Sequence, residues 1–312
     1  MTIAVLNTLA RSALEGKLPS WLVPRWFNGA DEAFALASEV EIGWFDALDP
    51  EPLREMVRRS DRLRWVTTIA AGVEHFPLGL MAERGVVLTN GAGLNAITIA
   101  EYAIMAMLSI AKGYREVIRA QDRREWLTEA PGKRTLAGSR ALILGAGAIG
   151  GRIAALLGPF GVEVATMRRH PRAGELGPDT WRDRLGEFDW VVVTIPATPD
   201  THHLVGSAEL AAMKRGAAIL NVSRGALIDQ AALVAALDRG HLGAAFLDVT
   251  DPEPLPPDNP LWTMPSVHLS MHLSGRSQDT QVTHGAARFL DNLARWRRGE
   301  PLLHTVDLAR GY

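Results

Sequence analysis

The sequence predicts an α/β protein with two domains, each built on a doubly wound parallel β-sheet. The chain is 312 residues long and 47% hydrophobic, which is enough to bury the cores of about two domains. Short apolar runs alternate with helical segments along most of the chain, a pattern typical of βα units. The 29 glycines and 18 prolines fit the many tight turns that such a fold needs.

The first predicted domain begins at the N-terminus. Four apolar runs alternate there with amphipathic segments, and they are expected to be strands: residues 3–6, 41–45, 63–69 and 86–88. Residues 97–118 then show one long helical pattern that is apolar on most faces at its start. We expect this helix to be buried on both sides and to join the two domains.

The second predicted domain contains six further apolar runs, separated by helical or loop segments. These runs are residues 141–144, 162–167, 190–195, 217–222, 244–249 and 267–269. Runs that are this short and this apolar predict parallel strands covered on both faces. A last helix is predicted over residues 279–298, with Phe289, Leu293 and Trp296 on one face.

Composition excludes several kinds of chemistry and partner. The chain has no cysteine, which excludes disulfides, thiolate nucleophiles and cysteine-based metal centres, and we predict no metal site. The net charge is −2 and the arginines are scattered among acids, which argues against a nucleic-acid partner. The most apolar run, residues 99–111, contains Glu101 and is shorter than the ~20 residues that span a bilayer. With no recognisable secretion signal, we expect a cytoplasmic protein with no membrane partner.

A glycine-rich turn follows the strand predicted at residues 141–144. Gly145, Gly147 and Gly150 form the pattern G-x-G-x-x-G, which includes Ile149, and a helical pattern follows. In this setting the first glycine permits the tight turn, the second lets the backbone approach a pyrophosphate, and the third lets helix and strand pack closely. The sequence therefore predicts that these residues bind a dinucleotide in a Rossmann-like domain.

The end of the next strand indicates which dinucleotide is bound. An acidic residue at this place normally accepts hydrogen bonds from the ribose hydroxyls. Here Met167, Arg168, Arg169 and His170 occupy the place, and the first acidic residue is Glu175. Two guanidinium groups can hold a 2′-phosphate by charge-assisted hydrogen bonds. This favours NADP(H), while a solvated basic turn with NAD(H) as the cofactor remains the alternative.

Three polar residues stand at or just beyond later predicted strands. They are Arg224 in NVSRGALID, Glu253 in the proline-rich loop DVTDPEPLPPDNP, and His272 in VHLSMHLSG. Each alone has an ordinary structural explanation, as a turn cap, a loop carboxylate or a surface histidine. Ligands of doubly wound folds bind at the carboxyl ends of the strands, so together the three are candidates for an active site.

These stretches, together with LILGAGAIGGRIA, resemble the D-isomer-specific 2-hydroxyacid dehydrogenase family, and the resemblance covers nearly the whole chain. It implies that Arg224 binds the substrate carboxylate and polarises the keto oxygen. It also implies that His272 is the general acid and base, and that Glu253 pairs with its imidazole and stabilises the protonated form. The nicotinamide would supply the hydride, so no protein nucleophile is needed.

The resemblance also implies supporting roles. Ala71 and Gly72, in TTIAAGVEHFP, would offer backbone N–H groups to the substrate carboxylate, and Asp248 would lie near the nicotinamide carboxamide. Other positions that match cofactor contacts are Pro196, Thr201, Val222, Ser223, Arg224, His272, Ser274 and Gly275. For Pro196 and Thr201, a loop-shaping proline and a helix cap explain the residues equally well.

Two residues depart from the family's pattern, and two further features bear on the substrate and on a dimer contact. Met271 stands where the family usually has proline, which predicts a less rigid loop, and Glu74 replaces the usual aspartate. Residues 67–72 contain no arginine or lysine to neutralise a phosphate, which favours small 2-keto acids such as glyoxylate or hydroxypyruvate. Trp126 matches a position that in some relatives reaches the dimer partner's active site, although we expect it to be a core anchor.

The family fold implies a discontinuous substrate-binding domain, residues 1–98 plus 275–312, and a dinucleotide-binding domain, residues 99–274, with a deep cleft between them. Relatives form homodimers through the cofactor domain, and residues 97–140 would supply that surface. The leading hypothesis is an NADPH-dependent 2-keto acid reductase that forms the D-2-hydroxy acid. One alternative is the same fold acting on another hydride donor, such as phosphite or formate. Another is a non-catalytic dinucleotide-sensing protein, like the C-terminal binding corepressors.

Overall fold

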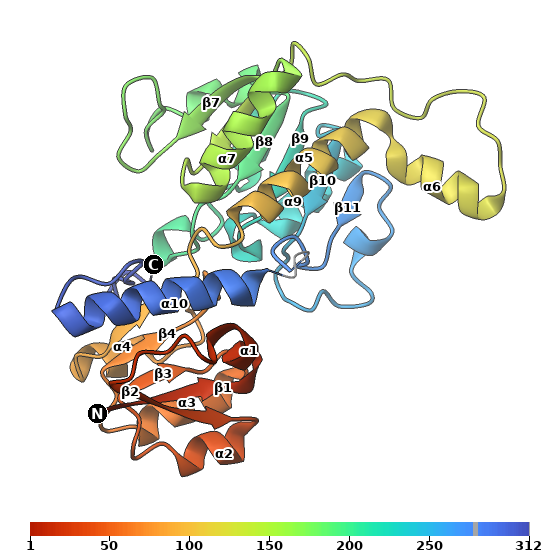
Figure 1. Cartoon of the computed structure of the whole chain (residues 1–312). Coiled ribbons are helices and arrows are strands. Elements are labelled where there is room, and N and C mark those ends of the chain that lie inside the picture. Colours follow the sequence, from red (N-terminus) through yellow and green to blue (C-terminus); the bar gives the residue numbers. More distant parts are fainter. Residues whose placement is uncertain (277–279, 312) are drawn as a thin grey trace. The chain divides into compact units, whose positions relative to one another are not determined.

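The computed structural model describes residues 1–276 and 280–311 (Figure 1). The chain divides into two compact units. Unit 1 comprises Met1–Asn95 with Gln278–Tyr312, and unit 2 comprises Ala96–Ser277. Each unit is built on one parallel sheet, which confirms the predicted α/β fold class.

Unit 1 has a five-stranded sheet with the order β2-β1-β3-β4-β5, and all its strands are parallel. The strands are β1 (Thr2–Asn7), β2 (Leu22–Phe27), β3 (Ile42–Trp44), β4 (Trp65–Thr67) and β5 (Val87–Thr89). The sequence pattern missed β2, because Pro24 and Arg25 interrupt its apolar residues. Both are tolerated because β2 is an edge strand. Its outer side pairs with no other described strand, so a proline that lacks an N–H there removes no hydrogen bond of the sheet.

The described residues of unit 1 form five α-helices. They are α1 (Arg11–Leu14), α2 (Ala30–Ala35), α3 (Pro50–Arg59), α4 (Leu78–Glu83) and α10 (Gln281–Arg298). The predicted start of the last helix, Asp279, lies outside the described residues. Phe289 of α10 is buried against the rings of Trp44 and Trp65, at centroid distances of 5.5 and 5.2 Å. The C-terminal helix is therefore part of the core of unit 1.

Unit 2 has a six-stranded sheet with the order β11-β10-β9-β8-β6-β7, again with every strand parallel. The strands are β6 (Arg140–Leu144), β7 (Glu163–Met167), β8 (Trp190–Val193), β9 (Ala218–Asn221), β10 (Ala244–Leu247) and β11 (Val267–Leu269). All six apolar runs predicted as strands are confirmed. The interior strands β8, β9 and β10 are buried at every position, because helices cover both faces of the sheet.

Two hydrophobic cores lie on opposite faces of this sheet. Helices α5 (Ala96–Lys112) and α7 (Ala148–Leu157) pack on one face, and α8 (Ser207–Ala212) and α9 (Gln230–Asp238) pack on the other. Short 3-10 helices complete both units: η1 (Thr8–Ala10), η2 (Gly158–Phe160), η3 (Arg182–Glu187), η4 (Pro199–Thr201), η5 (Gly225–Leu227) and η6 (Pro260–Trp262).

The long helix predicted over residues 97–118 is broken in two. After α5 ends, the chain bends by 70° and continues as α6 (Tyr114–Arg123). Gly113 makes the bend with φ +62°, and a Cβ atom there would lie 2.7 Å from the backbone nitrogen of Gly132. The break thus falls at a glycine in the left-handed conformation, which also packs against the backbone of residues further along the chain. Among the described residues, no single helix is long and apolar enough to cross a membrane, and α5 with α6 passes that test only as a bent pair.

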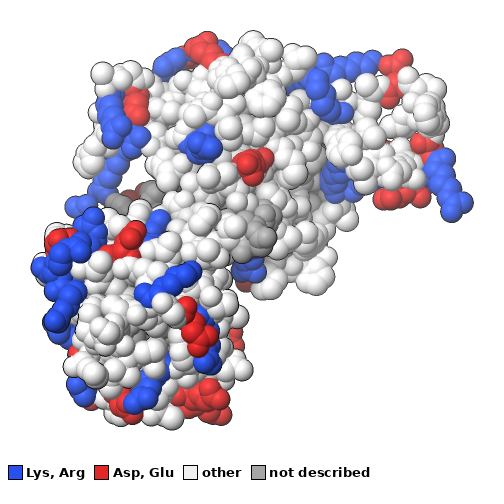
Figure 2. Space-filling model, in the orientation of Figure 1, with Lys and Arg blue, Asp and Glu red and all other residues white. Residues whose placement is uncertain are grey.

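The expected burial of α5 on both sides is also wrong. Its inner face carries buried residues such as Ala103 and Met107, but Ile97 and Met105 on its outer face are 54% and 47% exposed. Figure 2 shows acidic and basic side chains interspersed on the visible face, with a largely uncharged area over the middle of unit 2. Ile97 and Met105 are therefore exposed apolar side chains on α5 in the part of the chain that the structure describes.

Candidate active site

The glycine-rich turn lies between β6 and α7, as the motif predicts. Gly145 has φ +107°, which favours glycine, and a Cβ atom on Gly150 would collide with the carbonyl oxygen of Gly145. Gly147 is the residue before α7, makes no side-chain cap, and has open space where a Cβ would stand. The first N–H groups of α7 therefore face an open, uncapped helix end, which fits a dinucleotide pyrophosphate. The side chain of Ile149 packs against the core, and its predicted contact with the cofactor stays a prediction.

The predicted cofactor residues at the end of β7 lie next to this turn. The backbone N–H groups of Gly145 and Ala146 both donate to the carbonyl of Met167, at 3.1 and 3.2 Å. Arg168 and Arg169 follow directly, Arg168 half-buried and Arg169 exposed. The structure therefore brings together the two segments that were predicted separately to bind the dinucleotide.

Thr201 acts as a cap in the loop after β8. Its Oγ1 accepts a hydrogen bond from the backbone N–H of Thr198 at 2.8 Å and donates to the carbonyl of Pro196 at 2.9 Å. These bonds close the first turn of η4, as the helix-cap explanation requires. In the neighbouring turn, the Ser223 hydroxyl donates to the carbonyl of Ile195. Direct contacts of these residues with a cofactor stay predictions.

Arg224 follows β9 and immediately precedes η5. Its Nη1 donates to the carbonyl of Ser223 at 2.8 Å, and its own carbonyl accepts from Asn221 Nδ2 at 2.8 Å. A Cβ atom on Gly225 would collide with the carbonyl oxygen of Thr250, so the turn after β9 packs directly against the loop after β10. Glycine at 225 therefore lets the Arg224 turn approach the loop that carries the predicted catalytic carboxylate.

His272 and Glu253 form the predicted pair. Nδ1 of His272 lies 2.8 Å from Oε2 of Glu253, and each side chain is a little more than one third exposed. The other oxygen, Oε1, accepts the backbone N–H of Thr250 at 3.0 Å, so the carboxylate itself is held in place. With Nδ1 turned to the carboxylate, Nε2 is left to exchange a proton with a ligand, and the pair suits general acid and base catalysis.

Asp248 holds the loop that carries His272. The side chain is 3% exposed, and its Oδ1 accepts from Ser270 Oγ at 2.6 Å and from the N–H groups of Leu273 and Ser274 at 3.1 Å each. The Ser274 hydroxyl donates to Oδ2, and the N–H of His272 donates to the backbone carbonyl of Asp248 at 2.5 Å. Sequence reasoning missed this anchoring role, although serines on both sides of the histidine are a signal for it.

The loop predicted to bind the substrate carboxylate lies in unit 1 and is held by a residue that sequence reasoning missed. Asp46 accepts hydrogen bonds from Trp44 Nε1 at 2.5 Å, from the N–H of Ile69 at 2.8 Å and from the Thr68 hydroxyl. Burial raises the pKa of Asp46, and the three donors oppose this effect. The available signal was an acidic residue directly after a strand.

A second anchor fixes the next part of that loop. The carbonyl of Ala71 accepts from Asn90 Nδ2 at 2.8 Å, and the carbonyl of Ala70 accepts from the N–H of Gly91 at 2.7 Å. With these carbonyls bound, the peptide planes around Ala71 and Gly72 have a defined orientation. Their predicted contact with a substrate carboxylate stays a prediction.

Comparisons with known proteins identify the family. The model of the D-isomer specific 2-hydroxyacid dehydrogenase NAD-binding domain matches residues 104–274. The chain belongs to this dehydrogenase family. It is accordingly an NAD(P)-dependent oxidoreductase, as the glycine turn and the site geometry indicate.

Relatives of this dehydrogenase have more than one activity. A glyoxylate reductase from Korarchaeum cryptofilum is 31% identical, covering 79% of this chain and 76% of the relative. The formate dehydrogenase of Arabidopsis thaliana is 30% identical, covering 79% of this chain and 66% of the relative. A solved D-isomer specific 2-hydroxyacid dehydrogenase from Xanthobacter autotrophicus, in complex with NADPH, has a TM-score of 0.81 at 30% identity, covering 100% of this chain and 99% of that one.

The loop of the dehydrogenase that carries His272 has an unusual backbone. Met271, which replaces the family's usual proline, has φ +51°, and His272 has φ +57°. The ring of proline fixes φ near −65°, so proline is incompatible with this conformation. A non-glycine residue in the left-handed region costs roughly 1 kcal/mol or more. The bonds to Asp248 hold the loop in this conformation.

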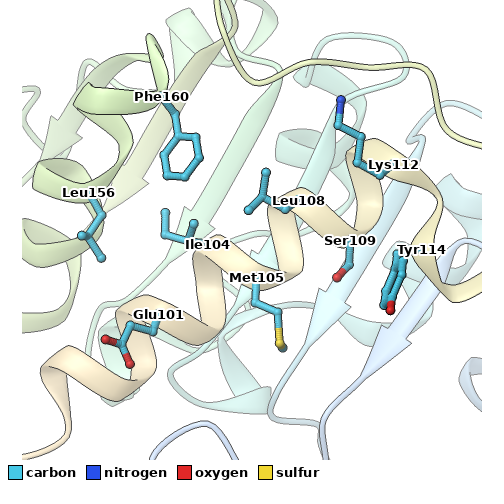
Figure 3. Close-up of a pocket in the computed structure, with 9 residues that line it drawn as sticks. All are labelled: Glu101, Ile104, Met105, Leu108, Ser109, Lys112, Tyr114, Leu156 and Phe160. Atoms are coloured by element: carbon cyan, nitrogen blue, oxygen red, sulfur yellow. The ribbon is translucent and has the colours of Figure 1, made fainter.

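Trp126 of the dehydrogenase is not a core anchor, because it is 94% exposed. It lies in the segment after α6, close in sequence to other exposed apolar residues, among them Tyr114 and Leu127. Beside α5, an apolar hollow of about 530 Å³ is lined by nine residues (Figure 3): Glu101, Ile104, Met105, Leu108, Ser109, Lys112, Tyr114, Leu156 and Phe160. The expected core position is wrong because the segment after α6 extends away from the core of unit 2 (Figure 1).

Proposed function

We propose that this dehydrogenase is an NADPH-dependent reductase of small 2-keto acids such as glyoxylate or hydroxypyruvate, forming the D-2-hydroxy acid. The observation that carries the proposal is the 2.8 Å pair between His272 Nδ1 and Glu253 Oε2. Glu253 follows β10 and His272 follows β11. Because the strands are parallel, both lie beyond the carboxyl ends of the strands, on the same side of the sheet as the glycine turn after β6. The glyoxylate reductase among the relatives supports the substrate class.

Each residue has a distinct task in the proposed reaction. A bound nicotinamide would supply the hydride that reaches the keto carbon. Nε2 of protonated His272 donates a proton to the keto oxygen, so that the carbonyl becomes an alcohol, and Glu253 holds the ring and balances its charge. Arg224 binds the carboxylate and polarises the carbonyl, with Ala71 and Gly72 offering backbone N–H groups.

The proposed cofactor is NADP(H). Gly145, Gly147 and Gly150 leave room for the pyrophosphate at the start of α7, and Arg168 with Arg169 supplies two guanidinium groups for a 2′-phosphate. The solved relative with bound NADPH supports this preference. The further contacts proposed are those of Ile149, Pro196, Thr201, Val222, Ser223, Asp248, Ser274 and Gly275.

Absorbance of NADPH and of NADH, followed with a panel of 2-keto acids at one pH, tests the proposal. We expect turnover of a small unphosphorylated keto acid, with higher kcat/KM for NADPH. Oxidation of formate or phosphite with reduction of NADP⁺ in place of keto acid turnover would instead support the branch to which the formate dehydrogenase relative belongs. Tight NADPH binding without turnover of any acid would support a dinucleotide-sensing protein.

We further propose that the protein is a homodimer, with a second copy covering the apolar hollow beside α5. Exposed Met105, Tyr114 and Phe160 line this hollow and match an apolar partner. Exposed Trp126 would then contact the partner. Sedimentation of wild type and Met105→Arg tests this, since a charge in an apolar interface should shift the protein to monomer.

The cytoplasmic location expected from the sequence stays a prediction.

A further inference from the structure

The segment that follows β7 is a closed loop rich in cations. The N–H of Arg168 donates to the carbonyl of Leu176 at 3.0 Å, and the N–H of Leu176 donates to the carbonyl of Thr166 at 2.8 Å. The N–H of Glu175 donates to the carbonyl of Arg172 at 3.0 Å. The backbone thus returns to the end of β7 after eight residues, four of which are basic: Arg168, Arg169, His170 and Arg172.

The Glu175 carboxylate ties this loop together from within. Its Oε1 accepts from Nε of Arg168 at 2.9 Å, and its Oε2 accepts from the backbone N–H of Arg172 at 2.9 Å. The side chain is 16% exposed. The Arg172 N–H, followed by the Arg168 guanidinium, lowers the pKa of Glu175, so the carboxylate is charged at neutral pH.

Glu175 binds Arg168 through Nε, and this decides which nitrogens of Arg168 can bind a ligand. Glu175 takes the Nε hydrogen, which leaves the two terminal nitrogens as the donors for another oxyanion. A guanidinium fixed at Nε has already lost most of its rotamer freedom, so less is lost when a ligand binds. Both Glu175 oxygens accept hydrogen bonds from within the loop itself.

We propose that Glu175 is a positioning residue for cofactor choice, which holds Arg168 so that its terminal nitrogens bind the 2′-phosphate of NADP(H). The inference rests on the proposed NADP(H) preference and goes beyond it. The positioning role and simple electrostatics predict opposite changes in 2′-phosphate affinity when Glu175 is removed. If Glu175 only weakened the positive field, its removal would tighten the binding of a 2′-phosphate. If it positions Arg168, its removal weakens that binding.

Calorimetric titration of the full-length protein with 2′,5′-ADP and with 5′-ADP separates these cases. We expect Glu175→Gln to weaken 2′,5′-ADP binding by about fivefold to tenfold and to change 5′-ADP binding less than twofold. Arg168→Ala should weaken 2′,5′-ADP binding by at least tenfold. In the Arg168→Ala background, Glu175→Gln should have no further effect, because the two residues act through one contact.

The chain offers a matched control at Glu209. Its Oε1 accepts from Arg182 Nε at 2.7 Å, its Oε2 accepts from the N–H of Gly206 at 3.0 Å, and its side chain is 15% exposed. Glu209→Gln should leave binding of both nucleotides unchanged. Retained 5′-ADP binding by Glu175→Gln shows that the variant is folded, and if it is lost, Glu175→Asp serves as the test instead.

Three results distinguish failure of the inference from failure of the proposed function. Tighter or unchanged 2′,5′-ADP binding by Glu175→Gln, with the Arg168→Ala effect present, overturns the positioning role alone. Equal loss from Glu209→Gln also overturns it, since the effect would then be general. If the wild type binds 5′-ADP as well as 2′,5′-ADP and Arg168→Ala changes neither, the NADP(H) preference fails, and the inference fails with it.

Discussion

The two units share one topology but differ in their first turn. In each sheet the first strand of the unit lies between the second and third, giving β2-β1-β3-β4-β5 and β7-β6-β8-β9-β10-β11. In unit 2 the first strand leads through Gly145 and Gly147 into the ten-residue helix α7. In unit 1 the first strand leads through η1, which contains no glycine, into the four-residue helix α1.

This difference teaches that the order of strands does not by itself make a dinucleotide site. A pyrophosphate needs close approach to the backbone and a helix long enough to present free N–H groups and a dipole. The third residue of α7 is Gly150, which lies against the preceding strand's turn, whereas the third residue of α1 is Ala13. Unit 2 therefore has a turn that fits a dinucleotide, and unit 1 has the loop that is predicted to bind the substrate carboxylate.

The largest effect is expected from removing His272, the proposed general acid of unit 2. His272→Ala should lower kcat by roughly 10³-fold, since general acid catalysis contributes about 10²–10⁴-fold, while the Kd for NADPH changes little. Steady-state rates and fluorescence titration measure the two quantities. His284→Ala, at an exposed histidine of α10 in unit 1, is the control and should be neutral. Normal kcat in His272→Ala would refute the assigned role.

A smaller effect follows from making the first turn of unit 2 like that of unit 1. Gly150→Ala places a Cβ against the Gly145 carbonyl, so we expect the Kd for NADPH to rise by about tenfold to 100-fold and Tm to fall. The matched change in unit 1, Ala13→Gly, should cost about 1 kcal/mol of stability through helix propensity and leave NADPH binding unchanged. Unchanged affinity in Gly150→Ala would contradict the assigned glycine turn.

Lowering the pH below about 6.5 should destabilise unit 2 through protonation of His268. Burial, with Arg115 and Arg119 nearby, lowers the pKa of His268 from 6.5 to about 4. The unfolded chain therefore binds more protons between pH 6.5 and 4, and stability is lost as the pH falls through this window. The expected contribution is about 1–2 kcal/mol, reduced from the full linkage value because the ring is partly exposed. Urea unfolding of His268→Gln at pH 7 and pH 4.5 should show less acid loss than wild type.

The smallest effect is expected at Met271, where unit 2 holds a left-handed backbone. Met271→Gly should raise the free energy of unfolding by up to about 1 kcal/mol, because glycine adopts φ +51° without the steric cost. The control is Ala235→Gly, which lies within α9, and it should be destabilising by about 1 kcal/mol. Thermal unfolding compares both, and a destabilised Met271→Gly would argue against strain in the loop.

Local patterns predicted most of the fold and the principal site residues. The interior strands β8, β9 and β10 are almost continuous apolar runs because both faces of their sheet are buried, and this leaves a signal in the sequence. Strand β2 left a weaker signal because it is an edge strand containing Pro24 and Arg25. Arg224, Glu253 and His272 were found from their motifs, and the 2.8 Å pair between the last two is confirmed in the structure.

The amino-acid sequence by itself determined the fold class and the glycine turn, because each depends on residue types at short or fixed spacing, and the family resemblance implied the pairing of His272 with Glu253. Only the tertiary structure decided where α5 ends, how Asp248 and Asp46 hold their loops, and that Trp126 is exposed. The anchored loops depend on contacts between residues distant in the chain, such as Asp46 with Ile69, whose energies no local pattern contains.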